Sequence, residues 1–97
     1  MTTHVVFEVD GHLFALPTGD VARFRQRTPG EADVGWTVEL VAGGEVSTHG
    51  RPTLRPLTRF LALPRHLSFW TDRGLKAACP VEGRLAFLAS PPWFLGP

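Results

Sequence analysis

The sequence predicts a mainly β fold, a small barrel or sandwich of short antiparallel strands with one short helix. Apolar and polar residues alternate along several short segments, as they do in half-buried strands. Gly or Pro turns separate these segments at intervals of roughly 8–12 residues, a spacing typical of small all-β domains. With 97 residues, 43% of them hydrophobic, the chain is predicted to form one domain over residues 1–97.

The first segment, from His4 to Val21, predicts a β-hairpin. Asp10-Gly11 is a preferred pair for a two-residue type I′ turn, in which both central residues need positive φ. This turn sets the register, so that Val5 faces Leu16, Phe7 faces Phe14 and Val9 faces His12. One face of the hairpin is therefore apolar and is expected to lie in the core; it carries Val5, Phe7, Val9, Phe14 and Leu16.

The opposite face of this hairpin is mixed, because Val6, Leu13 and Ala15 lie beside Glu8. We expect a later part of the chain to cover it in part. Pro17 ends the second strand, since it has no backbone N–H to donate to a neighbour.

A third strand is predicted to begin at Val21, and it carries alternating arginines at Arg23, Arg25 and Arg27. In a strand, alternate side chains lie on one face, so the three guanidinium groups would form a basic stripe. Such a stripe could bind phosphate or an acidic protein surface. A solvent-exposed strand often has the same pattern, and we favour this second explanation.

The middle of the chain predicts a loop, a strand and two turns. Residues 28–35 are polar and contain Pro29-Gly30, which marks a loop. Residues 36–42 alternate as a strand with one apolar face, and Gly43-Gly44 then turns the chain. A second tight turn is predicted at residues 49–52, between segments 45–48 and 53–57.

The one predicted helix covers residues 56–62. Leu57, Phe60 and Leu61 have the i, i+3, i+4 spacing of a short amphipathic helix, and Pro64 would end it. Beyond it, residues 66–70 and 75–79 are predicted to form a hairpin around a turn that contains Gly74.

The last predicted strand covers residues 85–88 and follows a Glu82-Gly83 turn. The tail at 90–97 contains three prolines and cannot be a central strand. Its Trp93-Phe94 pair must therefore either fold back onto the core or dock on another surface.

No combination of residues points to catalysis. The four histidines are His4, His12, His49 and His66, and they stand singly, without the spacing of metal ligands. Neither a nucleophile elbow nor a phosphate-binding glycine loop occurs. The single cysteine, Cys79, is expected to be buried and inert. We therefore predict no enzymatic activity, no metal and no cofactor.

Composition and pattern alone predict a small soluble β domain and do not state its function. The net charge is +1, which provides no overall attraction for nucleic acid. Five aromatic residues could act as stacking platforms, but core packing explains them better: Trp36, Trp70, Trp93, Phe69 and Phe94. No apolar stretch is long enough to cross a membrane, and the first residues are too acidic for a signal peptide, so a cytoplasmic location is expected.

Three stretches together resemble the CheW-like chemotaxis coupling domains. The first is FEVDGHLFALPTGDVARF, with a strand, a Gly turn and an aromatic-Ala-Leu-Pro strand. The second is GEVSTHGRPTLRPLTRFLALP, in which Gly44 and Gly50 keep the six-residue spacing of the family and Leu61-Ala62-Leu63-Pro64 stands at the family's Leu-Gly-Leu-Pro. The third is HLSFWTDRGLKAACPVEGRLAFL, which resembles the family's later hairpin.

The resemblance implies a small SH3-like β-barrel fold and a function as a non-catalytic adaptor. Such an adaptor couples a CheA-like histidine kinase to chemoreceptors or to other coupling proteins. Family members are longer, so the chain would have either an abbreviated second sub-barrel or a divergent, miniature form.

In this family the second stretch contributes to the surface that contacts receptor and kinase. The resemblance therefore implies a partner-binding site at His49, Gly50 and Arg51. His49 stands where the family has an arginine, one residue is missing between Arg51 and Leu57, and Pro56 replaces the family's aspartate. The alternative hypothesis, from the residues alone, is a small β-barrel that binds nucleic acid through Arg23, Arg25 and Arg27.

Overall fold

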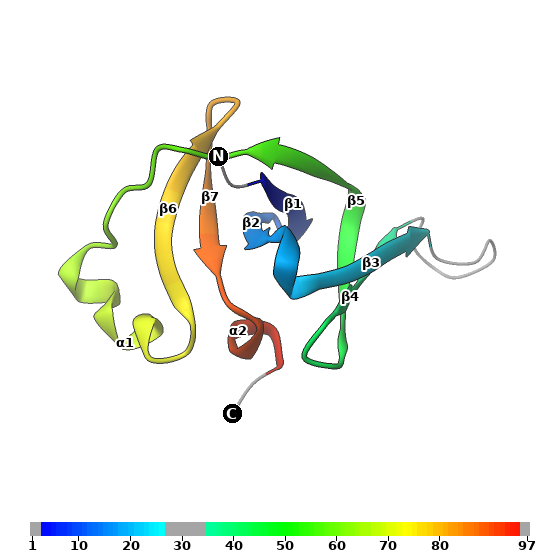
Figure 1. Ribbon diagram of the computed structural model, residues 1–97. Helices are drawn as coiled ribbons and strands as arrows, with labels where there is room; N and C mark the ends of the chain where they lie inside the picture. Colours follow the sequence, from blue (N-terminus) through cyan, green and yellow to red (C-terminus); the bar gives the residue numbers. More distant parts are fainter. Residues whose placement is uncertain (1–2, 27–34, 96–97) are drawn as a thin grey trace.

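The computed structural model describes residues 3–26 and 35–95, and this part of the chain is mainly β (Figure 1). Its strands are β1 (Thr3–Val9), β2 (His12–Pro17), β3 (Val21–Gln26), β4 (Trp36–Leu40), β5 (Glu45–Pro56), β6 (Leu75–Val81) and β7 (Arg84–Ala89). Two short helices, α1 (Ser68–Thr71) and α2 (Pro91–Leu95), and two 3-10 turns, Thr18–Asp20 and Arg65–Leu67, complete it. The mainly β prediction is confirmed.

The seven strands form one curved sheet in the order β3-β4-β5-β1-β2-β7-β6 (Figure 1). Neighbouring strands are antiparallel except β2 and β7, which are parallel. The sheet does not close into a barrel, which corrects the predicted closure. One reason is that the outer edge of β6 is occupied: Ala78 exchanges two backbone hydrogen bonds with Leu61, and Pro80 has no N–H to offer.

The predicted first hairpin is confirmed in its turn and register. Asp10 and Gly11 have φ of 51° and 82°, as a type I′ turn requires. The strand pairs are those expected from the turn: Val5 with Leu16, Phe7 with Phe14 and Val9 with His12. This hairpin lies at the centre of the sheet, and its two faces contribute residues to two separate buried clusters.

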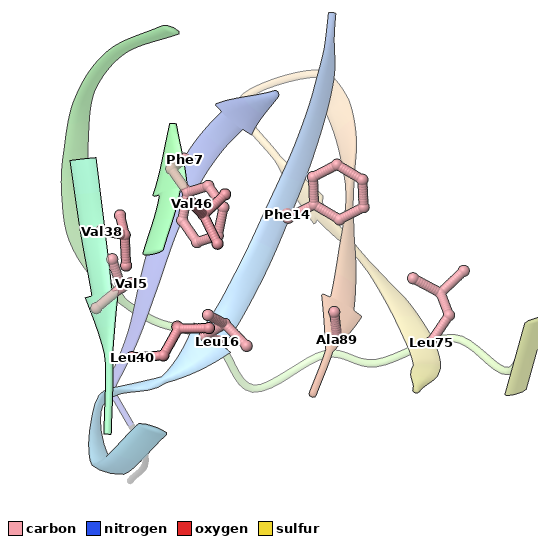
Figure 2. Close-up of a cluster of buried hydrophobic side chains, with 9 residues drawn as sticks. All are labelled: Val5, Phe7, Phe14, Leu16, Val38, Leu40, Val46, Leu75 and Ala89. Carbon is pink, nitrogen blue, oxygen red and sulfur yellow. The ribbon is translucent and has the colours of Figure 1, made fainter. Parts of the chain in front are cut away.

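The inner face of the sheet carries the larger core (Figure 2). Its buried side chains come from both halves of the sheet: Val5, Phe7, Phe14, Leu16, Val38, Leu40, Val46, Leu75 and Ala89. The outer face carries a smaller cluster of Val6, Ala15, Leu57, Cys79, Val81 and Ala86. The expected cover over the mixed face of the hairpin is therefore confirmed, and so is the burial of Cys79.

The tight turn predicted at residues 49–52 is wrong, because β5 runs without interruption from Glu45 to Pro56. The first part of β5 pairs with β4, and the second part pairs with β1. The register with β1 shifts where Val6 faces Thr53 and Glu8 faces His49. Gly50 has the predicted positive φ, 81°, but it bends the strand instead of reversing it.

The helix predicted at residues 56–62 is also wrong. Its three apolar residues make different contacts that a helix could not satisfy together. Leu57 is buried in the outer cluster, the Phe60 ring lies 5.5 Å from the His4 ring, and Leu61 bonds β6 through its backbone. Residues 65–71 are helical instead, so the hairpin predicted for 66–70 and 75–79 does not form, and β6 pairs with β7.

The remaining predictions near the ends of the chain are confirmed. Strand β7 covers the predicted residues 85–88, after a turn in which Glu82 and Gly83 have positive φ. The tail folds back as α2, and the Phe94 ring lies 5.5 Å from Phe7 and 5.3 Å from Phe14. Helix α2 thus covers the inner core between the two halves of the sheet (Figure 1). The loop predicted at 28–35 lies outside the described residues, apart from Gly35.

Candidate functional site

The three residues predicted to bind a partner, His49, Gly50 and Arg51, lie together at the bend of β5, and all three are exposed. The Arg51 guanidinium carbon is 5.6 Å from the centre of the Trp36 ring, a cation–π contact with β4. His49 lies opposite Glu8 of β1. The bend therefore presents an imidazole and a guanidinium side by side on the surface.

The bend is held by local bonds as well as by the glycine. The buried Thr48 hydroxyl is within hydrogen-bond distance of two backbone carbonyls, those of Trp36 (3.1 Å) and Gly50 (3.2 Å). The first contact ties Thr48 to β4, and the second is made within β5 at the bend. The positions of His49 and Arg51 are therefore set by the sheet.

Three hollows surround the tip of the β1–β2 hairpin and the neighbouring part of β5. The tip hollow, of about 330 Å³, is lined by Glu8, Val9, Asp10, Gly11, Ser47, Thr48 and His49. The bend hollow, of about 240 Å³, is lined by Val6, Phe7, Glu8, Leu13, His49, Arg51, Thr53, Arg55, Val81, Glu82 and Arg84. The inner hollow, of about 450 Å³, is lined by Val9, Asp10, His12, Phe14, Glu45, Val46, Ser47, Trp93 and Phe94.

The bend hollow is basic. Two of its arginines are neutralised by carboxylates: Arg55 Nη2 is 2.8 Å from Glu82 Oε1, and Arg84 Nη1 is 2.9 Å from Glu8 Oε1. Within the described part of the chain, Arg51 and His49 have no carboxylate partner. These two side chains thus remain available to an acidic group on another molecule, and apolar side chains lie beside them in the same hollow.

The tip hollow contains Ser47, His49 and Asp10, the residue types of a catalytic triad. No hydrogen bond joins any two of these side chains in the described residues, although a triad needs the nucleophile bonded to its base. Residues 3–26 and 35–95 also contain no group of three or more His, Cys, Asp and Glu side chains that could hold a metal ion. The described residues therefore show neither an assembled triad nor a cluster of metal ligands.

The predicted arginine stripe on β3 is engaged in ion pairs. Arg23 Nε donates a hydrogen bond to Glu39 on β4, and this bond, together with the negative charge of Glu39, raises the pKa of Arg23 above its ordinary value. Arg25 Nη2 is 3.2 Å from Glu45 Oε2 on β5. Arg27 lies outside the described residues. The two described arginines therefore offer phosphate less positive charge than the sequence suggests.

Most of the aromatic residues considered as stacking platforms pack within the protein. Trp36 contacts Phe24 at 6.0 Å, and Trp70 contacts Trp93 at 5.9 Å. Phe69 is the exposed exception, with 55% of its surface accessible. The preference for core packing is confirmed for Trp70 and Trp93, which pack against the larger core, whereas Trp36 is half-buried and contacts Phe24 and Arg51.

Sequence analysis did not identify the inner hollow, because its walls come from three distant segments. The hairpin tip supplies Asp10, the start of β5 supplies Glu45, and α2 supplies Trp93 and Phe94. The only available signal was the pair of aromatic residues in a proline-rich tail, which needed either a core or a partner.

No helix in the described residues is long and apolar enough to span a membrane. No known family model, curated protein or solved structure matches this chain.

Proposed function

We propose that the protein is a non-catalytic cytoplasmic adaptor of the CheW-like type, which couples a CheA-like histidine kinase to a chemoreceptor or to another coupling protein. The observation that carries this proposal is the pair His49 and Arg51, exposed at the bend of β5 with no carboxylate partner among the described residues. Both side chains line the bend hollow, whose apolar lining includes the half-buried Leu13 and the buried Val6 and Val81. Charged groups beside an apolar patch are a common composition for a protein-binding surface.

The competing hypothesis, nucleic-acid binding through Arg23, Arg25 and Arg27, has less support. Two of these arginines are paired with Glu39 and Glu45. The negative charges of Glu39 and Glu45 offset the positive charges of Arg23 and Arg25, so a phosphate would meet less net positive charge on β3. For this reason we favour the adaptor.

Binding to the regulatory domain of a CheA-like kinase tests the proposal. His49→Ala and Arg51→Ala should each weaken binding about five- to tenfold, as loss of a well-placed interface side chain does. His66→Ala and Arg65→Ala are matched controls, since both residues are exposed and lie on a different element. Isothermal titration calorimetry measures the four affinities, and a thermal melt checks that each variant is folded.

Unchanged affinity of folded His49→Ala and Arg51→Ala proteins would remove the bend of β5 from the adaptor hypothesis. No binding by the unmodified protein to any CheA-like kinase domain or chemoreceptor tip would contradict the proposed function itself.

A further inference from the structure

The inner hollow combines aromatic side chains with carboxylates in a single depression of about 450 Å³. That volume is within the range of small-ligand sites and is sufficient for one large side chain. Phe14, Trp93 and Phe94 provide rings from β2 and α2, and Val9 and Val46 add aliphatic surface. The hollow is therefore mainly apolar in its lining.

Two carboxylates, those of Asp10 and Glu45, also line this hollow. Asp10 is exposed and makes no hydrogen bond or ion pair within the described part of the chain. Glu45 forms an ion pair with Arg25, in which Arg25 Nη2 is 3.2 Å from Glu45 Oε2. The Arg25 side chain is 48% exposed and the Glu45 side chain is 55% exposed. The only other titratable group in the lining is His12. At neutral pH the hollow thus favours a cation over an anion.

We propose that the inner hollow binds an arginine side chain presented by a protein partner. The aliphatic stem and the flat guanidinium would pack against the aromatic rings, while the guanidinium donates hydrogen bonds to Asp10 and Glu45. Arginine fits better than lysine, because its planar, weakly hydrated guanidinium stacks on aromatic rings and reaches two carboxylates at once. This inference is independent of the adaptor proposal, which concerns the bend of β5.

The contact between Arg25 and Glu45 suggests how the site accommodates its ligand. An incoming guanidinium would compete with Arg25 for Glu45, an exposed pair that costs little to break. Removal of Arg25 should therefore improve binding, an effect opposite to that of removing either carboxylate.

The test is a nuclear magnetic resonance titration with N-acetyl-arginine N-methylamide. Its neutral isostere N-acetyl-citrulline N-methylamide is the control ligand. Binding is followed at the indole N–H of Trp93, and Trp36, which is outside the hollow, is the internal reference. We expect the arginine compound to shift the Trp93 signal saturably, with a millimolar dissociation constant that rises with salt, and the citrulline compound to bind at least threefold more weakly.

Three variants sharpen the test. Asp10→Asn should weaken arginine binding about threefold, and the backbone tolerates it because Asn accepts the positive φ of 51° at this position. Arg25→Gln should tighten binding about twofold by releasing Glu45. Asp72→Asn is the matched control, since Asp72 is exposed in another turn, and it should leave the dissociation constant unchanged.

Equal binding of the arginine and citrulline compounds would overturn the proposal, and so would the absence of any shift at Trp93. An Asp10→Asn protein that binds as well as the unmodified protein would exclude the assigned carboxylate. None of these results bears on the kinase titration, so the two proposals can fail separately.

Discussion

Gly50 shows how one residue determines the shape of the candidate site. Its φ of 81° lies in the left-handed region, where a side chain clashes with the backbone. A Cβ placed there would meet no other atom within 4 Å. Substitution of Gly50 is therefore expected to lower the free energy of unfolding through backbone strain alone.

We expect Gly50→Val to lower the free energy of unfolding by about 1–2 kcal/mol, because a β-branched residue is forced into a left-handed conformation. His49→Ala should leave stability nearly unchanged, since the His49 side chain is exposed. Gly19→Ala is the matched glycine control: its φ is not in the left-handed region, and its Cβ would also meet open space. Denaturant melts of the three variants measure these differences. Small and equal effects of all three would show that the bend does not depend on Gly50.

Among the secondary-structure elements, α2 covers the part of the inner core that the open sheet does not enclose. It follows β7 directly, and the backbone N–H of Ser90 donates a hydrogen bond to Gly74 at the start of β6. A Cβ at Gly74 would lie 2.6 Å from Ser90 Oγ and 3.1 Å from Trp93 N, so the glycine permits this close approach. Phe94 and Trp93 then pack against the hairpin at the centre of the inner core.

The helix should therefore contribute to global stability despite its length of five residues. Phe94→Ala should destabilise the protein by about 2–3 kcal/mol, somewhat less than a fully buried phenylalanine, because Phe94 is partly buried. Leu95→Ala, in the same helix but 43% exposed, should cost less than half as much. Thermal or denaturant unfolding of the two variants tests this, and equal losses would indicate that α2 does not cover the core as described.

The two outer strands of the sheet, β6 and β3, each have features that hinder pairing with a strand of another molecule. On β6, the Leu61 bridge and Pro80 leave little of the backbone free for another strand. On β3, Arg23 and Arg25 form ion pairs with the neighbouring strands. Such edges oppose the addition of a strand from another molecule. We therefore propose that a partner binds through side chains on the surface and not through the edge of the sheet.

Across the molecule as a whole, several arginines and glutamates lie close together in local ion pairs. The net charge is +1, and four of the arginines each lie within ion-pair distance of a glutamate: Arg23, Arg25, Arg55 and Arg84. Such pairing leaves no continuous basic stripe in the described residues, so a nucleic acid would meet less net positive charge there.

We accordingly expect single-stranded oligonucleotides to bind only weakly, with dissociation constants of about 100 μM or higher at physiological salt, at or beyond the weak end of the non-specific range. Fluorescence anisotropy at two salt concentrations measures this, with an Arg23→Gln, Arg25→Gln double variant as the comparison. Low-micromolar binding that weakens with salt and is lost in the double variant would favour the nucleic-acid hypothesis over the adaptor.

Features with a local cause could be predicted from the amino-acid sequence. The Asp10-Gly11 turn, the pairing of Phe7 with Phe14 and the mainly β composition follow from turn chemistry and alternation, and the structure confirms them. The CheW-like resemblance and the partner site at residues 49–51 remain predictions.

Features that depend on contacts between distant segments could not be predicted from the sequence. Leu57, Phe60 and Leu61 have helical spacing, yet contacts with the outer cluster, with His4 and with β6 hold them in an extended path. Gly50 has the conformation expected of a turn, but pairing with β4 before it and with β1 after it makes the segment one bent strand. The inner hollow exists because α2 packs against a hairpin that lies almost the whole chain away, and the free energy of that packing cannot be read from either segment alone.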